Sequence, residues 1–512
     1  MKGGKLKRAL ISVYDKRGIV EFAKGLVKNK YDIVSSGGTA KHLKDNGLEV
    51  REVSSITGIK EMLGGRVKTL HPFIFGGILA RKEDENELQK LGIYFFDIVV
   101  CNLYPFEEVV KYPDVTMADA IENIDIGGVA LLRAGAKNFE RVILVSDVAD
   151  YNWIIKRIEK DGLSYEERLS LAKKAFVYTT RYDSAISDFL SQKENFEEKL
   201  PSSIGITITK VHDLRYGENP HQNAGLYREL NSLNILPFEK YQGKELSFNN
   251  LVDMESALSI VNSFDEPTAV VIKHTNPCGI GKGKDTKEAY ERALSTDPMS
   301  AFGGIIGFNR TVTEETATII TKGFKEVIVA PSFEKEALEI FKKKKNLRVV
   351  KIENLIESNF DYRKIFAGWL IQERDMHKIN VKEWEYVSNR KPTEKEINAL
   401  HFAWKVVGFV KSNAIVITDD KRTLGIGAGQ MSRIDAAELA VKKAKQAGLE
   451  IKGAVLSSDA FFPFRDSIDF AAQEGITAVI EPGGSKRDQE VIDAANEKDI
   501  ILVFTHRRHF RH

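Results

Sequence analysis

The chain has 512 residues, 43% hydrophobic and 29% charged, a composition typical of globular proteins and long enough for about three to four domain-sized units. Its 75 basic and 73 acidic residues give a formal net charge of +2, which favours neither nucleic acid nor an anionic membrane as a partner. The two cysteines, Cys101 and Cys278, exclude a disulfide framework and fit a reducing compartment.

The N-terminal part alternates strands and helices in the manner of α/β domains. Buried strands are predicted at 9–13, 31–35, 96–102 and 141–146, with an amphipathic helix at 16–29. The first apolar run is too short for a signal-peptide core or a membrane span, so we expect a cytoplasmic enzyme. A polar, Pro- and Ser-bearing stretch at 191–203 predicts a domain boundary, which gives domains of 1–198 and 199–512.

The second domain carries a weak internal repeat. Three anchors recur in the same order, each shifted by about 150 residues: 269–272 with 414–417, 300–302 with 459–461, and 327–331 with 478–482. We therefore predict a duplicated α/β unit with halves of roughly 205–365 and 366–512. A cleft between such halves is a natural ligand site.

Two segments of the first domain could bind an anion. Ser36-Gly-Gly-Thr39 lies between a predicted strand and a helix, where unpaired amides attract phosphate, although such turns are also frequent for steric reasons alone. Gly65-Arg-Val-Lys-Thr-Leu-His-Pro72 holds two cations and a hydroxyl, and a solvated basic loop is an equal alternative. Neither a Walker loop nor a dinucleotide fingerprint occurs in the chain.

A third set in the first domain could move protons at a carbonyl group without a metal. Tyr104 follows a predicted strand, Asp125 lies in a Gly-rich turn, and Arg133 and Lys137 follow at helical spacing. Each of them could instead be a cap, a core tyrosine or half of an exposed ion pair. No Cys/His cluster or His-Glu-x-x-His pattern suggests a metal site.

Lys273 and His274 end the apolar run 268–272, which is predicted to be a buried strand followed by a turn at 276–279. A cation beside an imidazole at a strand end suits proton transfer, although a snorkelling lysine and a capping histidine are the simpler reading of the pair alone. Arg215-Tyr-Gly-Glu-Asn-Pro-His-Gln222 is too polar for a packing element and is predicted to be a ligand loop.

Further candidates lie in the second half of the repeat. The segment 411–413 leads into a predicted strand, and Arg433 precedes a predicted helix, where it could meet a phosphate. The segment 457–466 is either core phenylalanine with a surface ion pair or an aromatic slot in which Asp466 orients a heterocycle. A predicted final strand at 500–504 would hold Arg508 close to the fold.

Together these segments resemble the bifunctional AICAR transformylase/IMP cyclohydrolase family of purine biosynthesis over essentially the whole chain. The motifs that carry the resemblance are Lys68-Thr-Leu-His-Pro72, Asn102-Leu-Tyr-Pro-Phe106, Asn123-Ile-Asp-Ile-Gly-Gly128, Arg215-Tyr-Gly-Glu-Asn-Pro-His-Gln222, Lys273-His-Thr-Asn-Pro-Cys-Gly279, Gly427-Ala-Gly-Gln-Met-Ser-Arg433 and Asp459-Ala-Phe-Phe-Pro463. The resemblance implies a methylglyoxal-synthase-like N-terminal domain and a transformylase of duplicated cytidine-deaminase-like halves. It also implies 10-formyltetrahydrofolate as co-substrate, no tightly bound cofactor or metal, and a homodimer.

The resemblance further implies roles for individual residues. His274 is expected to take a proton from the 5-amino group of AICAR, while Lys273 stabilises the oxyanion. The expected cyclohydrolase set is Lys68, Tyr104, Asp125 and Lys137. The expected substrate-binding residues are Ser12, Lys16, Ser36, Gly37, Gly38, Thr39, Arg66 and Thr69 in the first domain, and Arg215, Tyr216, His221, Phe302, Gly303, Asn413, Arg433, Phe461, Asp466 and Arg508 in the second.

The sequence departs from the family at two places near the first set. Val129-Ala130 stand where a proline and a small residue are common, and Tyr14 stands where a serine is common. Two other functions stay open: a transformylase whose first domain has lost cyclisation, and a purine-nucleotide-binding protein without turnover.

Overall fold

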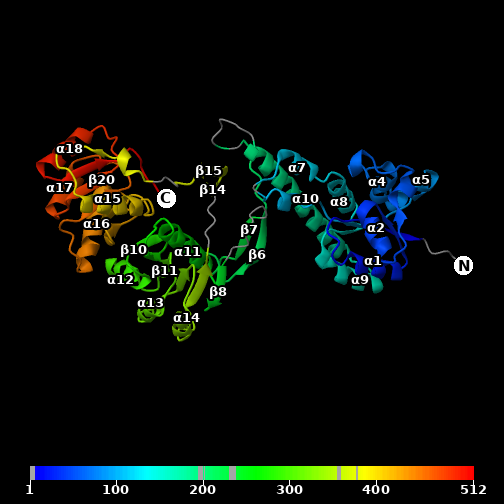
Figure 1. The fold of residues 1–512 in the computed structure, drawn as a ribbon, viewed down its shortest axis with the longest axis horizontal. Helices are drawn as coiled ribbons and strands as arrows, with labels where there is room; N and C mark the ends of the chain where they lie inside the picture. The colour runs from blue at the N-terminus through cyan, green and yellow to red at the C-terminus, as the bar shows by residue number, and fades with distance from the viewer. Residues whose placement is uncertain are drawn as a thin grey trace. The chain divides into compact units, whose positions relative to one another are not determined.

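The computed structural model describes residues 6–112, 114–193, 200, 202–229, 238–353, 359–375 and 379–512 (Figure 1). The chain divides into two compact units. The first comprises Met1–Thr209 with Arg228–Leu233, and the second comprises Lys210–Tyr227 with Asn234–His512. In the part of the chain that is described, no helix is long and apolar enough to cross a membrane.

The first unit is built on a five-stranded sheet in the order β3-β2-β1-β4-β5, and all its strand pairs are parallel. The strands are β1 (Lys7–Ser12), β2 (Tyr31–Ser35), β3 (Arg51–Glu52), β4 (Ile98–Cys101) and β5 (Ile143–Val145). The helices are α1 (Ile19–Lys28), α2 (Gly37–Asp45), α3 (Val53–Thr57), α4 (Pro72–Leu79), α5 (Glu85–Lys90), α6 (Phe106–Val109), α7 (Met117–Glu122), α8 (Gly127–Lys137), α9 (Tyr151–Glu159) and α10 (Tyr165–Lys193). The four strands predicted from the sequence are therefore confirmed as β1, β2, β4 and β5.

Helices pack against both faces of this sheet, as the alternating side chains of β1 show. Ala9 and Ile11 of β1 pack in one buried cluster with residues of α1 and α9. Leu10, between them, packs in another cluster with residues of α4, α8 and α10. Because successive side chains of a strand point to opposite faces, an unbroken apolar run produces a strand that is buried on both sides.

The second unit contains two six-stranded sheets with the same plan. The first has the order β8-β13-β12-β11-β9-β10, and the second has the order β16-β21-β20-β19-β17-β18. In both, the central pairs are parallel and the outer ones antiparallel. The first sheet comprises β8 (Phe238–Gln242), β9 (Thr268–Lys273), β10 (Asn276–Lys282), β11 (Ile305–Phe308), β12 (Val327–Ala330) and β13 (Arg348–Ile352). The second comprises β16 (Glu385–Tyr386), β17 (Ile415–Thr418), β18 (Thr423–Gly427), β19 (Val455–Ser458), β20 (Ala478–Glu481) and β21 (Ile501–Phe504).

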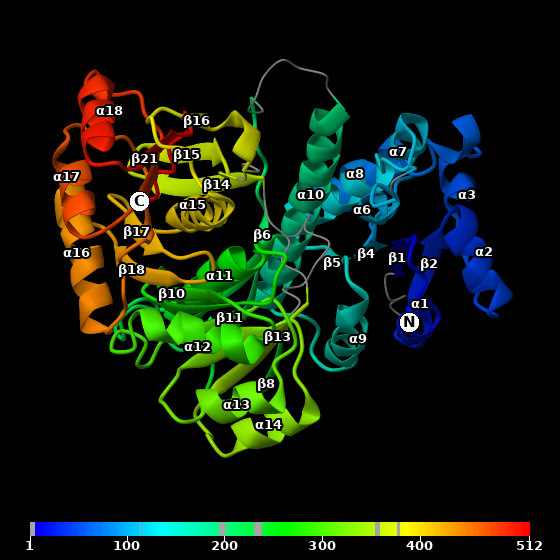
Figure 2. The same ribbon diagram turned by 60° about the vertical axis from the view of Figure 1, so that its left-hand side comes forward.

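The helices repeat in the same order and complete the duplication. The first half has α11 (Phe248–Val261), α12 (Thr286–Thr296), α13 (Glu314–Ile320) and α14 (Lys335–Lys342). The second has α15 (Glu394–Val407), α16 (Arg433–Gln446), α17 (Asp466–Gln473) and α18 (Asp488–Glu497). Residues of α11 and α15 share one buried cluster with strands of both sheets, and both helices lie in the middle of the unit in Figure 2. The predicted duplication thus has a structural counterpart in two matching halves.

One of the three sequence anchors of the repeat is wrong. The first anchor aligns β9 with β17, and the third aligns β12 with β20. In the middle anchor, however, 300–302 precedes β11 whereas 459–461 follows β19, and β11 and β19 are the equivalent strands. Two short loop segments that share Ala-Phe therefore matched by chance, since only the strand order fixes the equivalence.

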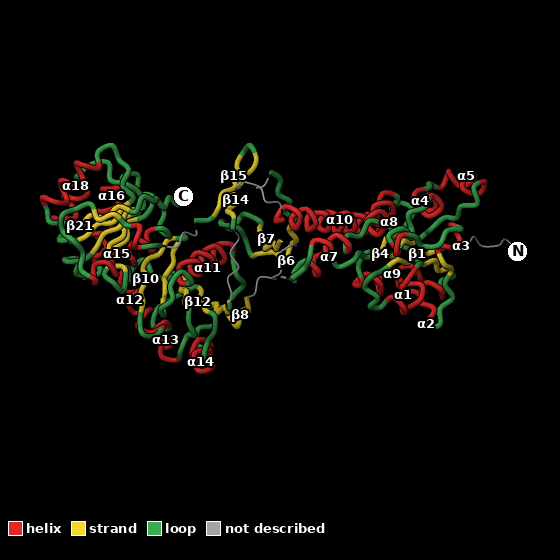
Figure 3. Tube along the Cα trace, turned by 45° about the horizontal axis from the view of Figure 1, so that its top comes forward, coloured by secondary structure: helices red, strands yellow, loops and turns green. Residues whose placement is uncertain are grey.

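Two small ribbons lie outside the six-stranded sheets, and both are yellow in Figure 3. One pairs β6 (Ile208–Leu214) with β7 (Ala224–Glu229), and the other pairs β14 (Phe360–Ile365) with β15 (Gly368–Glu373). The expected boundary between the halves, 365/366, falls in the turn of the second ribbon.

Candidate active sites

The first group of predicted residues gathers at the carboxyl edge of the parallel sheet. Ser12 ends β1, Ser36 follows β2 directly, and Tyr104 comes three residues after β4 ends at Cys101. The chain runs outward in opposite directions from β1 and β4, so these strands flank the topological switch point. Open α/β sheets bind their ligands in the crevice outside that point.

The start of α2 offers backbone amides to an anion. Ser36 is the N-cap and makes no side-chain bond to the helix, while Gly37 has a positive φ of 51°. Thr39 is already engaged, because its buried hydroxyl donates to the Val13 carbonyl at 2.9 Å and accepts from the Val13 amide at 3.2 Å. Thr39 therefore holds the loop after β1, and the free amides are those of the first turn.

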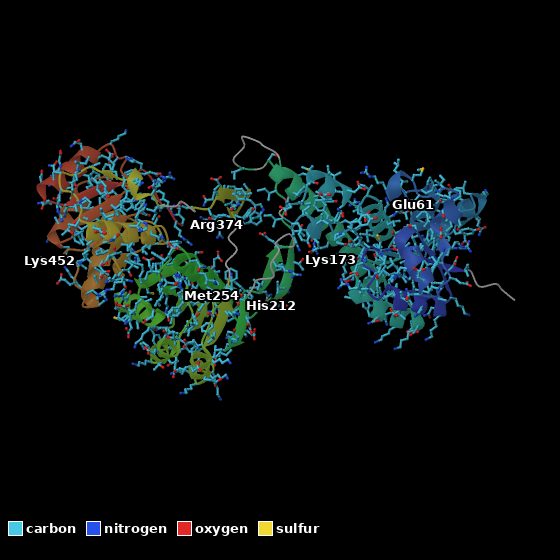
Figure 4. All side chains as sticks on the ribbon, in the orientation of Figure 1. Glu61, Lys173, His212, Met254, Arg374 and Lys452 are labelled. Carbon is cyan, nitrogen blue, oxygen red and sulfur yellow. The ribbon has the colours of Figure 1, made fainter. Side chains whose placement is uncertain are left out.

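Lys68 lies over this helix start. A Cβ atom at Gly37 would lie 3.3 Å from the Lys68 ammonium, and one at Gly65 would lie 2.7 Å from its Cε. The ammonium is 3.6 Å from a carboxylate oxygen of Glu61, which is labelled in Figure 4. The two glycines thus leave room for a lysine beside the predicted phosphate site.

Of the other predicted residues of this loop, Arg66 pairs with Glu122, and Thr69 is buried with its hydroxyl near Gly127.

Asp125 is held at the start of α8. Its carboxylate accepts hydrogen bonds from the Gly128 amide at 2.6 Å and the Tyr104 amide at 3.3 Å. Burial raises the pKa of Asp125, while the two amides and the positive charge of Lys68 act in the opposite direction. Lys68, Tyr104 and Asp125 are therefore brought together, with a half-buried carboxyl group among them.

Tyr14, one of the two departures from the family, contacts this group. Its ring lies edge-on to the Tyr104 ring with centroids 5.5 Å apart, and the Lys16 ammonium is 5.9 Å from the Tyr14 ring centre. The other departure, Val129-Ala130, lies within α8, which begins at Gly127.

Lys137 is not brought to this group. It is the last residue of α8 and is exposed, whereas Asp125 lies just before the first. A helix of that length separates its ends by about 15 Å, more than a lysine side chain can reach. Its catalytic role remains a prediction that the arrangement of α8 does not support.

Three residues that position this site were missed by the sequence reasoning. The Tyr182 hydroxyl accepts from the Asp125 amide at 2.9 Å, and the Tyr178 hydroxyl accepts from the Leu103 amide at 3.1 Å. Asn102 joins the loops after β1 and β4 through bonds to the Tyr14 and Asp15 amides. The two tyrosines are four residues apart on α10, so the sequence alone indicates that they share one helix face. It does not indicate their hydrogen-bond partners, which lie in distant segments.

The second group centres on Lys273 at the end of β9. Its ammonium donates to the Phe302 carbonyl at 2.6 Å and lies 3.8 Å from where a Cβ at Gly303 would be. Gly303 has a positive φ of 69°, and the exposed Phe302 ring lies 5.4 Å from the Phe324 ring. A cavity of about 190 Å³ beside Lys273 is lined by residues of both halves, among them Cys278, Asp297, Ile426 and Lys443.

The turn after Lys273 differs from the prediction. In the antiparallel β9–β10 ladder, Lys273 is the partner of Asn276, so the turn consists of His274 and Thr275 alone. Both residues have a positive φ, of 52° and 65° respectively. The segment 276–279, predicted to be the turn, belongs to β10. Pro277 is accommodated because β10 is an edge strand of its sheet with a bulge between Pro277 and Gly279.

The Arg215 loop is fastened to the start of α11. Within the loop, the Gly217 amide donates to the Gln222 carbonyl at 2.8 Å, and Arg215 lies 5.3 Å from the Tyr216 ring centre. The Asn249 side chain on α11 donates to the Glu218 carbonyl at 3.1 Å. His221 is exposed in the same loop.

In the second half, Arg433 contacts or lies close to several of the remaining candidate residues. It is the first residue of α16 and donates to the Asn413 side-chain oxygen at 2.6 Å, and its guanidinium lies 3.3 Å from an Asp459 oxygen. Arg433 and Arg508 both stack on Phe510, at 5.9 and 4.6 Å from the ring centre. Burial lowers the pKa of Arg433, and the charges of Asp459 and Glu481 oppose this effect.

Glu481 supports the neighbouring aromatic loop and was not predicted as a site residue. It is fully buried at the end of β20, and one carboxylate oxygen accepts from the Phe462 amide. Its other oxygen has no hydrogen-bond partner among the residues that the structure describes, and burial raises the pKa of Glu481 to about 8. Phe461, which precedes Phe462, is partly exposed. Asp466 begins α17, and its side chain accepts a hydrogen bond from the Ser467 amide at 2.8 Å.

A side-chain hydrogen bond joins the two halves next to the His274-Thr275 turn. The Asn276 oxygen accepts from the Lys411 amide at 3.0 Å. Asn276 is two residues from His274, and Lys411 is two residues from Asn413. The hydrogen bond therefore ties the segment after the His274-Thr275 turn to the loop that contacts Arg433 through Asn413.

Known proteins resemble this chain over nearly its whole length. A family model described as AICARFT/IMPCHase bienzyme matches residues 135–443, and one described as MGS-like domain matches residues 18–130. The chain is 51% identical over 516 residues to the bifunctional purine biosynthesis protein PurH of Persephonella marina, covering 99% of this chain and all of the relative. It is 49% identical over 514 residues to the PurH protein of Oceanobacillus iheyensis and 49% identical over 515 residues to that of Aquifex aeolicus, each with 99% of this chain and all of the relative covered.

Proposed function

The chain belongs to the AICARFT/IMPCHase bienzyme family and is a bifunctional enzyme of purine biosynthesis, and we propose that its two reactions use the two residue groups described above. In this assignment, residues 1–198 carry the IMP cyclohydrolase and residues 199–512 the AICAR formyltransferase. The formyl donor is 10-formyltetrahydrofolate, used as a co-substrate without a tightly bound cofactor. The two halves of the formyltransferase are cytidine-deaminase-like.

In the formyl transfer, His274 accepts a proton from the 5-amino group of AICAR as the amine attacks the formyl carbon. Lys273 places a positive charge beside the oxygen that becomes negative and assists departure of the folate nitrogen. The observation that carries this proposal is the Lys273–Phe302 hydrogen bond at the end of β9, which fixes a cation next to an exposed imidazole.

Nucleotide and folate binding in the second domain is assigned to both halves. Arg433 and Arg508 present cations over Phe510, and Asn413 adds an amide bonded to Arg433, a combination that suits a nucleotide. The first-half residues are Arg215, Tyr216, His221, Phe302 and Gly303. Phe461 and Asp466 contribute an aromatic wall and a carboxylate on the second-half side, where a pterin would bind.

In the cyclisation, the carboxamide nitrogen attacks the formyl carbon of the same molecule, and water is then lost. Because both groups belong to one substrate, holding them in a single geometry removes much of the entropic barrier. Lys68, Tyr104 and Asp125 are the acid–base set, and the start of α2 with Ser12 and Lys16 holds the phosphate and ribose.

We also propose a cytoplasmic homodimer. The β14–β15 ribbon exposes Phe366 fully, and Trp369 and Leu370 by more than half. A cluster of large exposed apolar side chains of this kind marks a protein–protein contact.

A two-step assay tests the function. The protein is incubated with AICAR and 10-formyltetrahydrofolate, and inosine monophosphate is the expected product. Accumulation of formyl-AICAR without cyclisation identifies a formyltransferase alone, and supplying formyl-AICAR directly separates that case from the bifunctional one. Nucleotide binding with no turnover in either step contradicts the proposal.

A further inference from the structure

The turn formed by His274 and Thr275 has a left-handed backbone conformation, which these residues adopt only at a conformational cost. Two-residue hairpin turns with two left-handed positions normally use Asn-Gly or Asp-Gly, because glycine adopts a positive φ without cost. Here the two positions hold His274 and Thr275, with φ of 52° and 65°. A β-branched threonine with a positive φ is an outlier, so something else must hold the turn.

The equivalent hairpin in the other half avoids the problem. β17 and β18 pair up to Thr418 and Thr423, so four residues, 419–422, connect them. All four are described in the structure, and none has a positive φ. The fold therefore does not require a two-residue turn at this position. A local interaction must stabilise the turn between β9 and β10.

That cause is Asp253 on α11. Its carboxylate oxygen accepts from the Thr275 amide at 2.7 Å. Burial raises the pKa of Asp253, while the Thr275 amide and the charged forms of His274 and Lys273 act in the opposite direction. The residue precedes Met254, a core side chain labelled in Figure 4, so the carboxylate is fixed to a packed helix.

The same face of α11 also holds the Arg215 loop. Asn249 lies four residues before Asp253, which places both on one helix face. Asn249 donates to the Glu218 carbonyl and Asp253 accepts from the Thr275 amide. One rigid helix thus fixes both first-half loops that the proposed function assigns to the formyltransferase.

We propose that Asp253 is a positioning residue of the formyltransferase, whose carboxylate holds the His274-Thr275 turn in its left-handed conformation and so aims the imidazole and the Lys273 ammonium. This inference rests on the proposed function of His274. It assigns Asp253 no contact with substrate.

The test compares four variants: Asp253→Ala, Asp253→Asn, Thr275→Gly and the double variant Asp253→Ala/Thr275→Gly. Glu255→Ala, an exposed carboxylate on the same helix, is the matched control. Formyl transfer and cyclisation are measured separately, with kcat and KM for each. Glycine at position 275 removes the conformational cost that Asp253 is proposed to offset, so the double variant isolates the backbone effect.

We expect Asp253→Ala to lower the kcat of formyl transfer by about tenfold to a hundredfold, with the KM for AICAR and the rate of cyclisation little changed. Asp253→Asn, whose amide oxygen still accepts from the Thr275 amide, should stay within about threefold of the wild type. Thr275→Gly should recover a large part of the loss in the double variant. If Asp253→Ala is insoluble, recovery of soluble, active protein by Thr275→Gly supports the proposal.

The proposal is overturned if Asp253→Ala transfers formyl groups at the wild-type rate, or if glycine at position 275 recovers neither activity nor solubility. Its failure is distinct from failure of the proposed function. A wild-type protein without formyl transfer refutes the function, whereas an active wild type that loses activity with His274→Ala but not with Asp253→Ala refutes only the inference.

Discussion

The Lys273 ammonium lies 2.6 Å from the Phe302 carbonyl oxygen, so a cation at the end of β9 is tied to the loop that precedes β11. The bond leaves two of the three ammonium protons for other acceptors. It fixes the charge beside His274, where an oxyanion would form during formyl transfer.

Replacing Lys273 with methionine keeps the length of the side chain and removes its charge. We expect kcat for formyl transfer to fall by about a hundredfold or more, since loss of one oxyanion donor has an effect of that size. The KM for AICAR should change little, and cyclisation not at all. Lys282→Met, on β10 and paired with Glu266, is the control. Steady-state kinetics of both proteins check the prediction, and equal loss in the two variants would contradict it.

Lys68→Ala tests the cyclohydrolase group. Because the ammonium lies beside Gly37 and acts on the charge of Asp125, its loss should slow cyclisation of formyl-AICAR by about a hundredfold. Formyl transfer should be unaffected. Lys41→Ala, an exposed lysine on α2, should cyclise normally. A Lys68→Ala protein with wild-type cyclisation would remove Lys68 from the proposed set.

Glu481 predicts a pH dependence of stability. Its pKa is about 8 in the folded protein, above the value of 4.5 for an unperturbed glutamate. Between these values the folded state binds a proton that the unfolded state has lost, so stability falls as the pH rises, by up to about 1.4 kcal/mol per pH unit, and the loss is complete above pH 8.

Glu481→Gln removes this titration while keeping an oxygen for the Phe462 amide. The melting temperature of the variant should therefore rise relative to the wild type as the pH increases from 6 to about 9, measured by calorimetry on both proteins. A difference that does not change with pH would show that Glu481 is charged in the folded state throughout.

The sequence predicts those parts of the fold that rest on local pattern. The β-branched and apolar run 268–272 corresponds to nearly all of β9, because a strand buried on both faces is almost continuously apolar. The candidate site residues at the carboxyl ends of β1, β2 and β4 could likewise be expected to meet, since parallel strands end at a common edge.

What the sequence does not predict depends on contacts between distant segments. Asp253 lies 22 residues from Thr275, and Tyr182 lies 57 residues from Asp125, so no local pattern links either pair. The turn prediction for 276–279 is wrong because Asn, Pro and Gly favour turns in general, whereas the chain turns two residues earlier, at His274-Thr275, where the Thr275 amide donates to the Asp253 carboxylate. Lys137 matches a motif, yet α8 carries it away from Asp125.

The variant His274→Ala shows whether two separate groups of residues perform the two reactions. Formyl transfer from 10-formyltetrahydrofolate to AICAR and cyclisation of supplied formyl-AICAR are measured on the same preparation. We predict that formyl transfer is lost while cyclisation keeps its wild-type rate. Equal loss of both reactions, or formyl transfer at the wild-type rate, would contradict this prediction.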